Sequence, residues 1–363
     1  MTPASAQRIL QICPHDSAPF GALVQLYQQA AATLQLDVEN VILGQPAGSP
    51  LPGTTYLGLT DLSQTRAISQ ALNAWSQQNW TLVLCHRYRA YWAVVRSRLG
   101  RRPHQSTIAV AHEYGLLERW QRRVNRRLWA PQVQFAGVSA PVAQELAAIT
   151  GQHLVLPNGL DAVTNRARLE TRVSARQFLG VPDDCLVVGV VGRLHYKKRP
   201  QLALQGFAQF CRTQSAQPAR LVFLGEGEQR AELQQMADAL NAELAHVDVH
   251  LPGVVPDAQR YMCAFDVLLY PAVADSFGMV ALEAMDAGVP VVCKPGHGPG
   301  AVLGDLGNYV EQDTPDGYAA ALVKALAQDP AALLLAGRQR VDQQFSISAV
   351  ARALDAVLIE ASS

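Results

Sequence analysis

Short runs of apolar residues, many of them β-branched, alternate with helical patterns along the whole chain, and this alternation limits the fold more than any other feature. In the first half these runs cover 8–13, 38–43, 80–85, 106–111 and 135–138. A second series covers 185–192, 219–225, 247–251, 266–271 and 289–293. Because strands that alternate with helices form parallel sheets with right-handed crossovers, the pattern predicts an α/β fold. Two series of similar length predict two doubly wound, Rossmann-like domains that face each other across a cleft.

The chain length also favours two domains, because 363 residues exceed the usual size of one hydrophobic core. The boundary is predicted near PNGLDAVTNRARLE (157–170), where Pro-Asn-Gly turn residues meet a polar stretch. We expect an N-terminal domain over 1–162, a C-terminal domain over 163–344, and a final helix over 345–363 that returns to the N-terminal domain or packs on the C-terminal one. Doubly wound sheets bind ligands beyond the carboxyl ends of their strands, so residues that directly follow strands are the functional candidates.

The composition is that of an ordinary globular protein, with 49% hydrophobic residues and a formal net charge of zero. This charge gives no sign of a nucleic-acid partner. The six cysteines are scattered without CxxC or Cys/His spacing, so neither a zinc site nor a disulfide framework is predicted. The N-terminus MTPASAQRILQIC does not read as a signal peptide, and no run reaches the roughly 18 apolar residues of a spanning helix. We therefore expect a cytoplasmic protein, soluble or peripheral on a membrane.

Two cations follow the apolar run at 185–192. The sequence there reads VVGRLHYKKRP, with Arg193 directly after the run and Lys198 close behind it. Crowded cations are stabilised when an anion joins them, and the donor fork of arginine and the point charge of lysine both suit phosphate oxygens. A diphosphate site and a solvated basic turn both fit this spacing.

The next strand ends in FLGEGEQRAEL (223–233). Its glycines do not form a dinucleotide-binding fingerprint, because GxGxxR lacks the third glycine. We interpret Gly225 and Gly227 as residues of a tight turn before a helix. A dinucleotide-dependent oxidoreductase is disfavoured, since no strand–GxGxxG–helix unit occurs elsewhere in the sequence.

Two carboxylates mark the stretch DSFGMVALEAMDAGVPVV (275–292). Asp275 lies in the loop after a strand, and a helix is predicted to start near Phe277 or Gly278, whose free N–H groups would form an anion site. Glu283 lies early in this helix within an otherwise apolar run, and burial of a carboxylate is unfavourable unless something pairs with it. The hydroxyls of a ribose, a neighbouring arginine and backbone groups are the alternatives for its partner.

These stretches resemble the nucleotide-sugar signature of glycosyltransferase family 4, whose members are retaining enzymes of GT-B architecture. The family pattern has an acidic residue, seven further residues and then a glutamate, as Asp275 and Glu283 are spaced here. GRLHYKK is similar to the family's donor-phosphate motif, FLGEGEQRAEL to its Gly-acidic-Gly turn, and VLPNGLD (155–161) to its hinge. The matches cover 155–293 in the family's order. Gly21, His112 and GVSAPVAQEL (137–146) carry a weaker likeness over the first half.

The resemblance implies a role for each matched residue of the second half. Arg193 and Lys198 would neutralise the donor diphosphate, and Glu283 would hold the ribose hydroxyls. Asp275 takes the place of an acidic residue that contacts the transferred sugar in the family. The stretch HLPGVVPDAQRYMCAFDVLLYP, which contains Val254, is similar to the one whose backbone holds the base.

The resemblance also implies backbone contacts and one histidine. The N–H groups around Phe277, Gly278 and Met279 would meet the phosphate or the sugar. Gly21 would let backbone of the N-terminal domain approach the donor. His112 matches a histidine that lies beside the donor sugar in the family, and a histidine satisfied within the core is the alternative.

The chain departs from the family pattern at three places. Asp275 is one methylene shorter than the usual glutamate, and Gly21 stands in FGA rather than in a Gly-Gly pair. KPGHGPGAVLGD (294–305) replaces a Gly-Gly-x-x-Glu element. None of these changes removes the diphosphate site, so an active enzyme is expected.

The implied reaction moves a sugar from a UDP- or GDP-linked donor to a hydroxyl of a glycolipid or growing surface glycan, with retention of configuration. Cations would stabilise the leaving diphosphate, and neither a metal nor a further cofactor is expected. The likeness points to lipopolysaccharide or related cell-envelope polysaccharide biosynthesis. A GT-B nucleotide-sugar epimerase and a non-catalytic nucleotide-sugar-binding partner remain alternatives. The sequence identifies neither the base, the sugar, the acceptor nor the oligomeric state.

The segment GLLERWQRRVNRRLWAPQ (115–132) is rich in arginine. Its apolar residues Leu117, Trp120, Val124 and Leu128 fall at helical spacing. A basic amphipathic helix with tryptophans suits an anionic membrane or a phosphorylated glycolipid, and we predict peripheral binding to the cytoplasmic face of the inner membrane. A solvated helix that packs one face on its own domain is the alternative. The residues predicted to contact the membrane or the acceptor are Trp120, Arg122, Arg123, Arg126 and Arg127.

Overall fold

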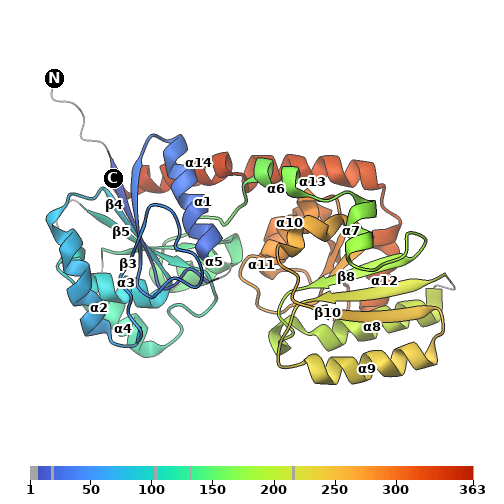
Figure 1. Ribbon diagram of the computed structural model, residues 1–363. Helices are drawn as coiled ribbons and strands as arrows, with labels where there is room; N and C mark the ends of the chain where they lie inside the picture. The colour runs from blue at the N-terminus through green and yellow to red at the C-terminus, as the bar shows by residue number, and fades with distance from the viewer. Residues whose placement is uncertain (1–6, 18–19, 102–104, 131, 215–216, 363) are drawn as a thin grey trace. The chain divides into compact units, whose positions relative to one another are not determined.

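The computed structural model describes residues 7–17, 20–101, 105–130, 132–214 and 217–362. The first six residues, over which no signal peptide is expected, lie outside these ranges. The chain forms two compact units, Met1–Leu160 with Gln344–Ser363 and Asp161–Gln343 (Figure 1). The units therefore divide between Leu160 and Asp161, where the sequence predicts a boundary after residue 162. Both are α/β with a parallel sheet, which confirms the predicted fold class.

The N-terminal sheet has the strand order β3-β2-β1-β4-β5-β6-β7, and its pairs are parallel. The predicted runs supply β1, β2, β4, β5 and β6. The short edge strands β3 and β7 were not predicted, because two or three residues carry no readable period. The strands are β1 (Arg8–Cys13), β2 (Asp37–Ile42), β3 (Thr54–Tyr56), β4 (Leu82–His86), β5 (Ser106–Ala111), β6 (Gln134–Gly137) and β7 (Leu154–Val155).

Helices connect these strands and cover the sheet. They are α1 (Phe20–Thr33), α2 (Thr65–Leu72), α3 (Arg87–Arg96), α4 (Trp120–Trp129) and α5 (Ala140–Thr150), with short 3₁₀ segments η1 (Asn73–Gln77) and η2 (Leu99–Arg101). The final helix α14 (Ile347–Ser362) belongs to this unit and lies along α1 (Figure 1). The Leu160 N–H donates to the Phe345 carbonyl at 2.9 Å, where the chain returns. Gly159 is required there, since a Cβ would lie 2.2 Å from that carbonyl oxygen.

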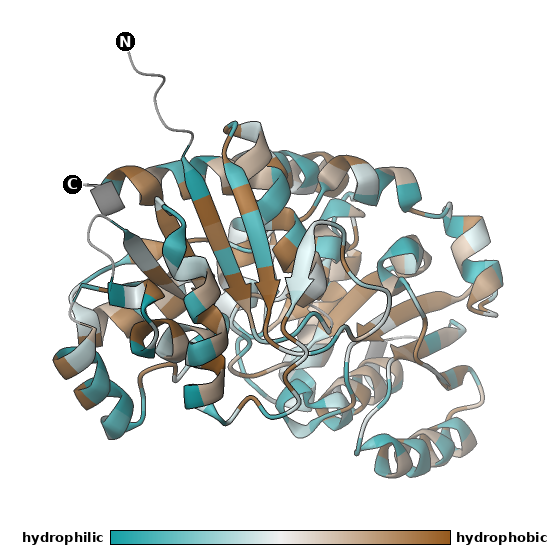
Figure 2. Ribbon diagram, turned by 60° about the vertical axis from the view of Figure 1, so that its left-hand side comes forward, coloured by the Kyte–Doolittle hydropathy of each residue, from teal (hydrophilic) through white to brown (hydrophobic). Residues whose placement is uncertain are grey.

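The C-terminal sheet has the order β10-β9-β8-β11-β12-β13, again with parallel pairs. Every residue of β8 is buried, and Figure 2 shows brown, hydrophobic stretches in the strands beside white and teal ones. Continuous apolar strands are typical of parallel sheets that helices cover on both faces. The strands are β8 (Leu186–Val191), β9 (Ala219–Leu224), β10 (Val247–Gly253), β11 (Val267–Tyr270), β12 (Val291–Cys293) and β13 (Asn308–Tyr309), of which only β13 was not predicted.

The helices of the C-terminal unit follow its strands in turn. They are α6 (Ala162–Arg168), α7 (Arg172–Phe178), η3 (Tyr196–Lys198), α8 (Pro200–Gln214), α9 (Arg230–Glu243), η4 (Ala258–Ala264), α10 (Met279–Asp286), α11 (His297–Leu303), η5 (Gly304–Leu306), α12 (Pro315–Leu326) and α13 (Pro330–Gln344). Over the described residues no single helix has the length and apolarity to cross a membrane. The pair α12 and α13 meets that criterion jointly, with a bend of 99° at the break.

Candidate functional site

The carboxyl ends of β8, β9 and β10 are tied together by backbone hydrogen bonds. The Gly192 N–H donates to the Leu224 carbonyl at 2.9 Å, and the Gly225 N–H donates to the Gly253 carbonyl at 2.8 Å. Gly225 has a φ of +154°, and a Cβ there would lie 1.9 Å from the Gly192 oxygen. The glycines of FLGEGEQ thus form a tight turn, as predicted. This turn holds the loop after β8, which carries the two predicted cations, in a fixed place.

Arg193 lies at the mouth of a small pocket that Lys198 and Tyr270 also line. Its side chain is exposed, and no described residue accepts a hydrogen bond from its guanidinium or pairs with it. An arginine without a carboxylate at the end of a buried strand is available to an incoming anion. The pocket therefore has one uncommitted cation.

Lys198 is committed to a partner. Its ammonium forms an ion pair with Asp275 and donates to the Tyr270 hydroxyl at 2.8 Å, while that hydroxyl donates to the Asp275 carboxylate at 2.5 Å. Burial alone would raise the pKa of Asp275, but the Lys198 charge and the hydrogen bonds from Lys198, Tyr270 and the Phe277 N–H hold that pKa below its usual value. Asp275 is therefore ionised at neutral pH. Sequence reasoning missed Tyr270, whose signal was a phenol at the last position of an apolar strand.

The helix α10 begins where the sequence predicts. Gly278 is its N-cap with a φ of +90°, a conformation that side chains rarely adopt. A Cβ on Gly278 would also lie 2.9 Å from Pro299. The N–H groups of Met279 and the following residues open the helix, and such groups lack partners within a helix. They form an anion-binding terminus next to Asp275.

Glu283 lies one turn into α10 and is partly buried. Burial raises the pKa of its carboxyl to about 7, from an ordinary value of 4.5. None of the described residues gives this carboxylate a hydrogen bond or an ion pair. Neither an arginine nor a backbone group of the described residues is therefore the partner of Glu283. Of the partners considered from the sequence, the hydroxyls of a ligand remain.

The divergent segment 294–305 forms α11 and packs against the loop before α10. The Gly298 N–H donates to the Asp275 carbonyl at 2.8 Å, and a Cβ at Gly298 would lie 2.1 Å from the Phe277 nitrogen. Lys294 pairs with Asp313 at 2.9 Å. The segment that departs from the family pattern therefore supports the 275–278 loop through backbone contacts.

His112 follows β5 and lies in a group of rings at the carboxyl ends of the N-terminal strands. Its Nε2 lies 2.8 Å from Nδ1 of His86, and its ring meets Phe20 edge to face. Burial, followed by the charges of His86 and Arg87, holds the pKa of His112 well below its usual value. Burial lowers the pKa of His86 to about 4. Both imidazoles are therefore neutral at pH 7. One of the two facing nitrogens carries a proton and donates it in a hydrogen bond to the other.

Gly21 and Val254 have different surroundings. Gly21 is buried in the first turn of α1, and a Cβ would lie 2.7 Å from the Asp16 carbonyl oxygen, so its own domain requires this glycine. Val254 is exposed directly after β10, beside the Gly253 carbonyl that Gly225 engages. The roles predicted for both residues toward the donor remain predictions.

In the helix α4, Arg122 and Arg126 have partners within their own domain, and the membrane or acceptor contact predicted for them stays a prediction. Arg122 donates to the Leu116 carbonyl at 2.9 Å and stacks on Tyr88, and the Arg126 guanidinium lies over Phe135. These two side chains turn toward their own domain because planar guanidinium groups can satisfy loop carbonyls and stack on rings. Arg123, Arg127 and Trp120 are exposed, although Arg123 also donates to the Leu117 carbonyl at 3.0 Å.

A metal site would need several histidine, cysteine, aspartate or glutamate side chains close together. Over the described residues, no group of three or more such side chains converges in a way that could hold a metal ion.

Part of the chain is similar to known proteins. Residues 185–328 match the family described as glycosyl transferases group 1. A D-inositol 3-phosphate glycosyltransferase of Geodermatophilus obscurus is 36% identical over 204 residues, which are 53% of this chain and 44% of that protein. A D-inositol 3-phosphate glycosyltransferase of Saccharomonospora viridis is 30% identical over an alignment that covers 75% of this chain and 63% of that protein. The chain spans about half the length of the curated relatives that it matches.

Solved structures share the fold over the whole chain. Sucrose-phosphate synthase from Thermosynechococcus elongatus aligns with a TM-score of 0.74 at 19% identity, covering 98% of both chains. Anabaena Alr3699/HepE, solved with UDP and glucose, aligns with a TM-score of 0.77 at 17% identity, covering 98% of this chain and 100% of that one. The chain therefore has the GT-B fold that the resemblance implied.

Proposed function

We propose that this chain, with the glycosyl transferases group 1 segment in its C-terminal domain, is a nucleotide-sugar glycosyltransferase that acts with retention. Its donor is a UDP- or GDP-linked sugar, and its acceptor is a hydroxyl of a glycolipid or growing surface glycan. The process served is lipopolysaccharide or related cell-envelope polysaccharide biosynthesis. The enzyme works without a metal, peripherally on the cytoplasmic face of the inner membrane.

One observation carries the donor assignment. An unpaired Arg193, a fixed Lys198–Asp275 pair and the N-terminus of α10 occupy neighbouring strand ends within the family-matched segment. Arginine and helix N–H groups are anion ligands, and two of them together suit a diphosphate. The complex of Alr3699/HepE with UDP and glucose supports the same donor class.

The leaving diphosphate gains negative charge in the transition state. Arg193 is exposed and free to neutralise it, and the α10 N–H groups meet the same charge without rearranging. Lys198 acts from a position fixed by Asp275 and Tyr270. Preorganised groups of this kind stabilise charge more than mobile ones, because no reorganisation accompanies the reaction.

Glu283 holds the ribose. Its carboxylate has no partner among the described residues, so two ribose hydroxyls can donate to it. The carboxylate must be ionised to accept both hydrogen bonds, and burial raises its pKa to about 7. Donor binding therefore favours loss of a proton from Glu283.

Asp275 and His112 serve the transferred sugar. Asp275 is ionised and held by Lys198, so it offers a fixed carboxylate oxygen to a sugar hydroxyl. His112 is neutral because of burial, so it can exchange hydrogen bonds with the sugar but does not add a positive charge. The backbone near Gly21 and Val254 contributes the remaining donor contacts.

A thermal-shift titration with UDP, GDP, dTDP, CDP and NAD tests the donor assignment. A ligand at 100 times its dissociation constant stabilises the folded state by about 2.7 kcal/mol. We expect one nucleoside diphosphate to stabilise the wild type, and an Arg193→Ala/Glu283→Ala variant to lose the effect. Arg168→Ala, an exposed arginine of α6 outside the pocket, is the matched control and should retain it.

Stabilisation by NAD alone, or by none of these ligands, contradicts the donor assignment. Product analysis with the cognate nucleotide sugar then tests the reaction class. Transfer to an acceptor supports the proposal, whereas a changed nucleotide sugar without an acceptor identifies an epimerase. Binding without turnover on any acceptor identifies a non-catalytic partner.

A further inference from the structure

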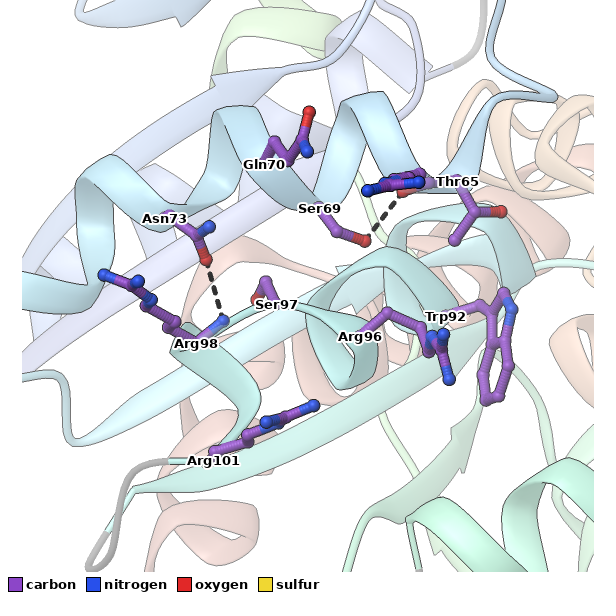
Figure 3. Close-up of a pocket in the computed structure, with 10 residues that line it drawn as sticks. Thr65, Ser69, Gln70, Asn73, Trp92, Arg96, Ser97, Arg98 and Arg101 are labelled. Atoms are coloured by element: carbon purple, nitrogen blue, oxygen red, sulfur yellow. Dashed lines mark hydrogen bonds between the residues drawn. The ribbon is translucent and has the colours of Figure 1, made fainter.

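A broad pocket lies on the N-terminal domain between α2 on one side and α3 with η2 on the other. Figure 3 shows Ser69 and Asn73 on one wall, and Trp92, Arg98 and Arg101 on the other. The Ser69 hydroxyl donates to the Thr65 carbonyl at 2.7 Å, and the Asn73 side chain accepts from the Arg98 N–H at 2.8 Å. These bonds fix the walls while the long basic side chains stay at the rim.

The charge of this pocket is of one sign. Four arginines line it, namely Arg66, Arg96, Arg98 and Arg101, and no aspartate or glutamate does. All four are exposed, and none lies within ion-pair distance of a carboxylate in the described ranges. Guanidinium groups that share a pocket without a counter-ion bind phosphate groups well, often through two parallel hydrogen bonds.

The helix α4 presents its apolar stripe to solvent. Trp120 and Leu128 are 69% and 68% exposed, and Val124 between them is also exposed. These residues are four apart, so they lie on one face. The exposed arginines Arg119, Arg123 and Arg127 lie near the stripe, and Arg123 also donates to the Leu117 carbonyl at 3.0 Å. Arg122 and Arg126 hold the opposite face against the domain. An ordinary surface helix packs its apolar face on the core and exposes its polar face. The helix α4 exposes its apolar face instead.

The pocket lies next to the helix α4. Arg96, which lines the pocket, lies 5.2 Å from the ring centre of Trp129, which ends α4 and is exposed. Arg122 of α4 also stacks on Tyr88 of α3. These two contacts hold α4, which carries the apolar stripe on its other face, beside the helix α3 that lines the arginine pocket.

The geometry points to a docking surface for an anionic lipid bilayer, in which the arginine pocket takes phosphate headgroups and Trp120, Val124 and Leu128 enter the interface. Tryptophan beside aliphatic residues, flanked by arginine, matches the chemistry of a helix that lies in a headgroup region. The inference deepens the proposed membrane-associated function and rests on it for its purpose. Its residues all lie outside the donor site.

A second copy of this chain fits the surface poorly. Contact through a two-fold axis would place Arg119, Arg123 and Arg127 against the same residues of the partner. Like charges across an interface destabilise it, and few carboxylates accompany this surface. A bilayer of anionic lipid supplies phosphate groups and an apolar phase together, which the observed surface requires.

Vesicle co-sedimentation of the full chain tests the inference. Vesicles of phosphatidylglycerol and phosphatidylcholine are compared with vesicles of phosphatidylcholine alone. Near an anionic surface each arginine contributes about fivefold in affinity, so we expect Arg98→Gln/Arg101→Gln to weaken binding roughly 25-fold. Trp120→Ser/Leu128→Ser removes apolar contacts and should also weaken it. Arg168→Gln/Lys324→Gln, which changes the charge equally on the C-terminal domain, should bind as the wild type does.

The inference is overturned in four cases. One is equal binding to both vesicle types, and another is an equal loss in the control variant, which would mean unspecific charge. A third is a dimer, seen by light scattering, that Trp120→Ser/Leu128→Ser dissociates. The fourth is binding of free phosphate or RNA that Arg98→Gln/Arg101→Gln abolishes, in the absence of vesicle binding. The stabilisation by nucleoside diphosphate should be unchanged in every surface variant, so a failed donor assignment is seen separately.

Discussion

The two domains treat their arginines in opposite ways. The N-terminal unit holds 14 arginines, no lysine and 9 acidic residues, a formal charge of +5, whereas the C-terminal unit holds 12 arginines, 4 lysines and 21 acidic residues, a charge of −5. The net charge of zero hides this division. In the C-terminal unit carboxylates meet most of the cations, in pairs such as Arg166–Asp286, Arg176–Asp266, Arg199–Asp313, Arg212–Glu243 and Arg220–Asp248.

The N-terminal unit leaves most of its arginines without carboxylates. Arg8 and Arg87 have ion pairs, but ten others have no described carboxylate within ion-pair distance: Arg66, Arg89, Arg96, Arg98, Arg101, Arg119, Arg122, Arg123, Arg126 and Arg127. Arg193 is unpaired in the same sense, and it stands at the proposed diphosphate site. The difference teaches that arginines that hold the fold have a partner in their own domain, either a carboxylate or, for Arg122 and Arg126, a carbonyl or an aromatic ring. Clusters of exposed arginines without such partners mark surfaces where an external anion would bind.

The largest effect is expected from Arg193, which has no ion-pair partner among the described residues. Arg193→Ala should lower the rate of sugar transfer from the cognate donor by about 10²–10³-fold, because it removes a preorganised charge at the leaving group. Steady-state kinetics measures the effect, with the melting temperature as a check on folding. Arg168→Ala should keep wild-type rates. A loss of less than threefold would show that the unpaired arginine is not at the reaction.

A paired arginine should instead report on stability. Arg176 is 1% exposed, and its guanidinium donates to Asp266 and to the carbonyls of Ala264, Asp183 and Cys185. Asp266→Asn leaves this buried charge uncompensated, so we expect the free energy of unfolding to fall by about 3 kcal/mol. Urea denaturation measures it. An unchanged midpoint would mean that the carbonyls alone satisfy the guanidinium.

Glu283 should make donor binding depend on pH. Without ligand its pKa is about 7, above the ordinary value of 4.5, so the folded state favours the protonated carboxyl. This contribution to the stability of the fold is present at low pH and is lost as the pH rises through about 7. Binding requires the ionised form, so affinity for a nucleotide sugar should rise up to tenfold per pH unit toward pH 7 and then level off. Tyr270 and Cys293 have raised pKa values and stay protonated in this range.

Isothermal titration between pH 5.5 and about 8.5 tests this dependence. A nucleotide sugar is used because its diphosphate has no ionisation near pH 7. Glu283→Gln should bind roughly tenfold more weakly at high pH and lose the slope. A slope that persists in Glu283→Gln would assign the titration to another group.

The smallest effect is expected at the surface of the N-terminal domain. Arg98→Gln should change the free energy of unfolding by less than about 0.5 kcal/mol, because Arg98 is exposed and has no described ion pair to lose. The urea midpoint measures it beside that of Asp266→Asn. A loss of unfolding free energy comparable to that of Asp266→Asn would show that Arg98 stabilises the fold. The contrast between the arginines of the two domains would then be wrong.

Much of the candidate site could be predicted from residue order. The helix start at Gly278 followed from a glycine after a polar loop, and the turn at Gly225 from paired glycines after a strand. The commitment of Lys198 to Asp275 could not be predicted, since the two residues are 77 positions apart. The same holds for Tyr270, because an apolar strand with a terminal phenol has no distinctive period.

The sequence by itself determined the alternation of strands and helices, the two domains and the order of the strand-end residues, since strand period and glycine turns are local properties. Tertiary structure alone decided which face of α4 is covered. Helical spacing shows that Trp120, Val124 and Leu128 share a face and that Arg122 and Arg126 share another. Only the neighbours Tyr88, Phe135 and the loop carbonyls decide which face turns inward, because stacking and hydrogen bonding of guanidinium groups depend on side chains distant in sequence.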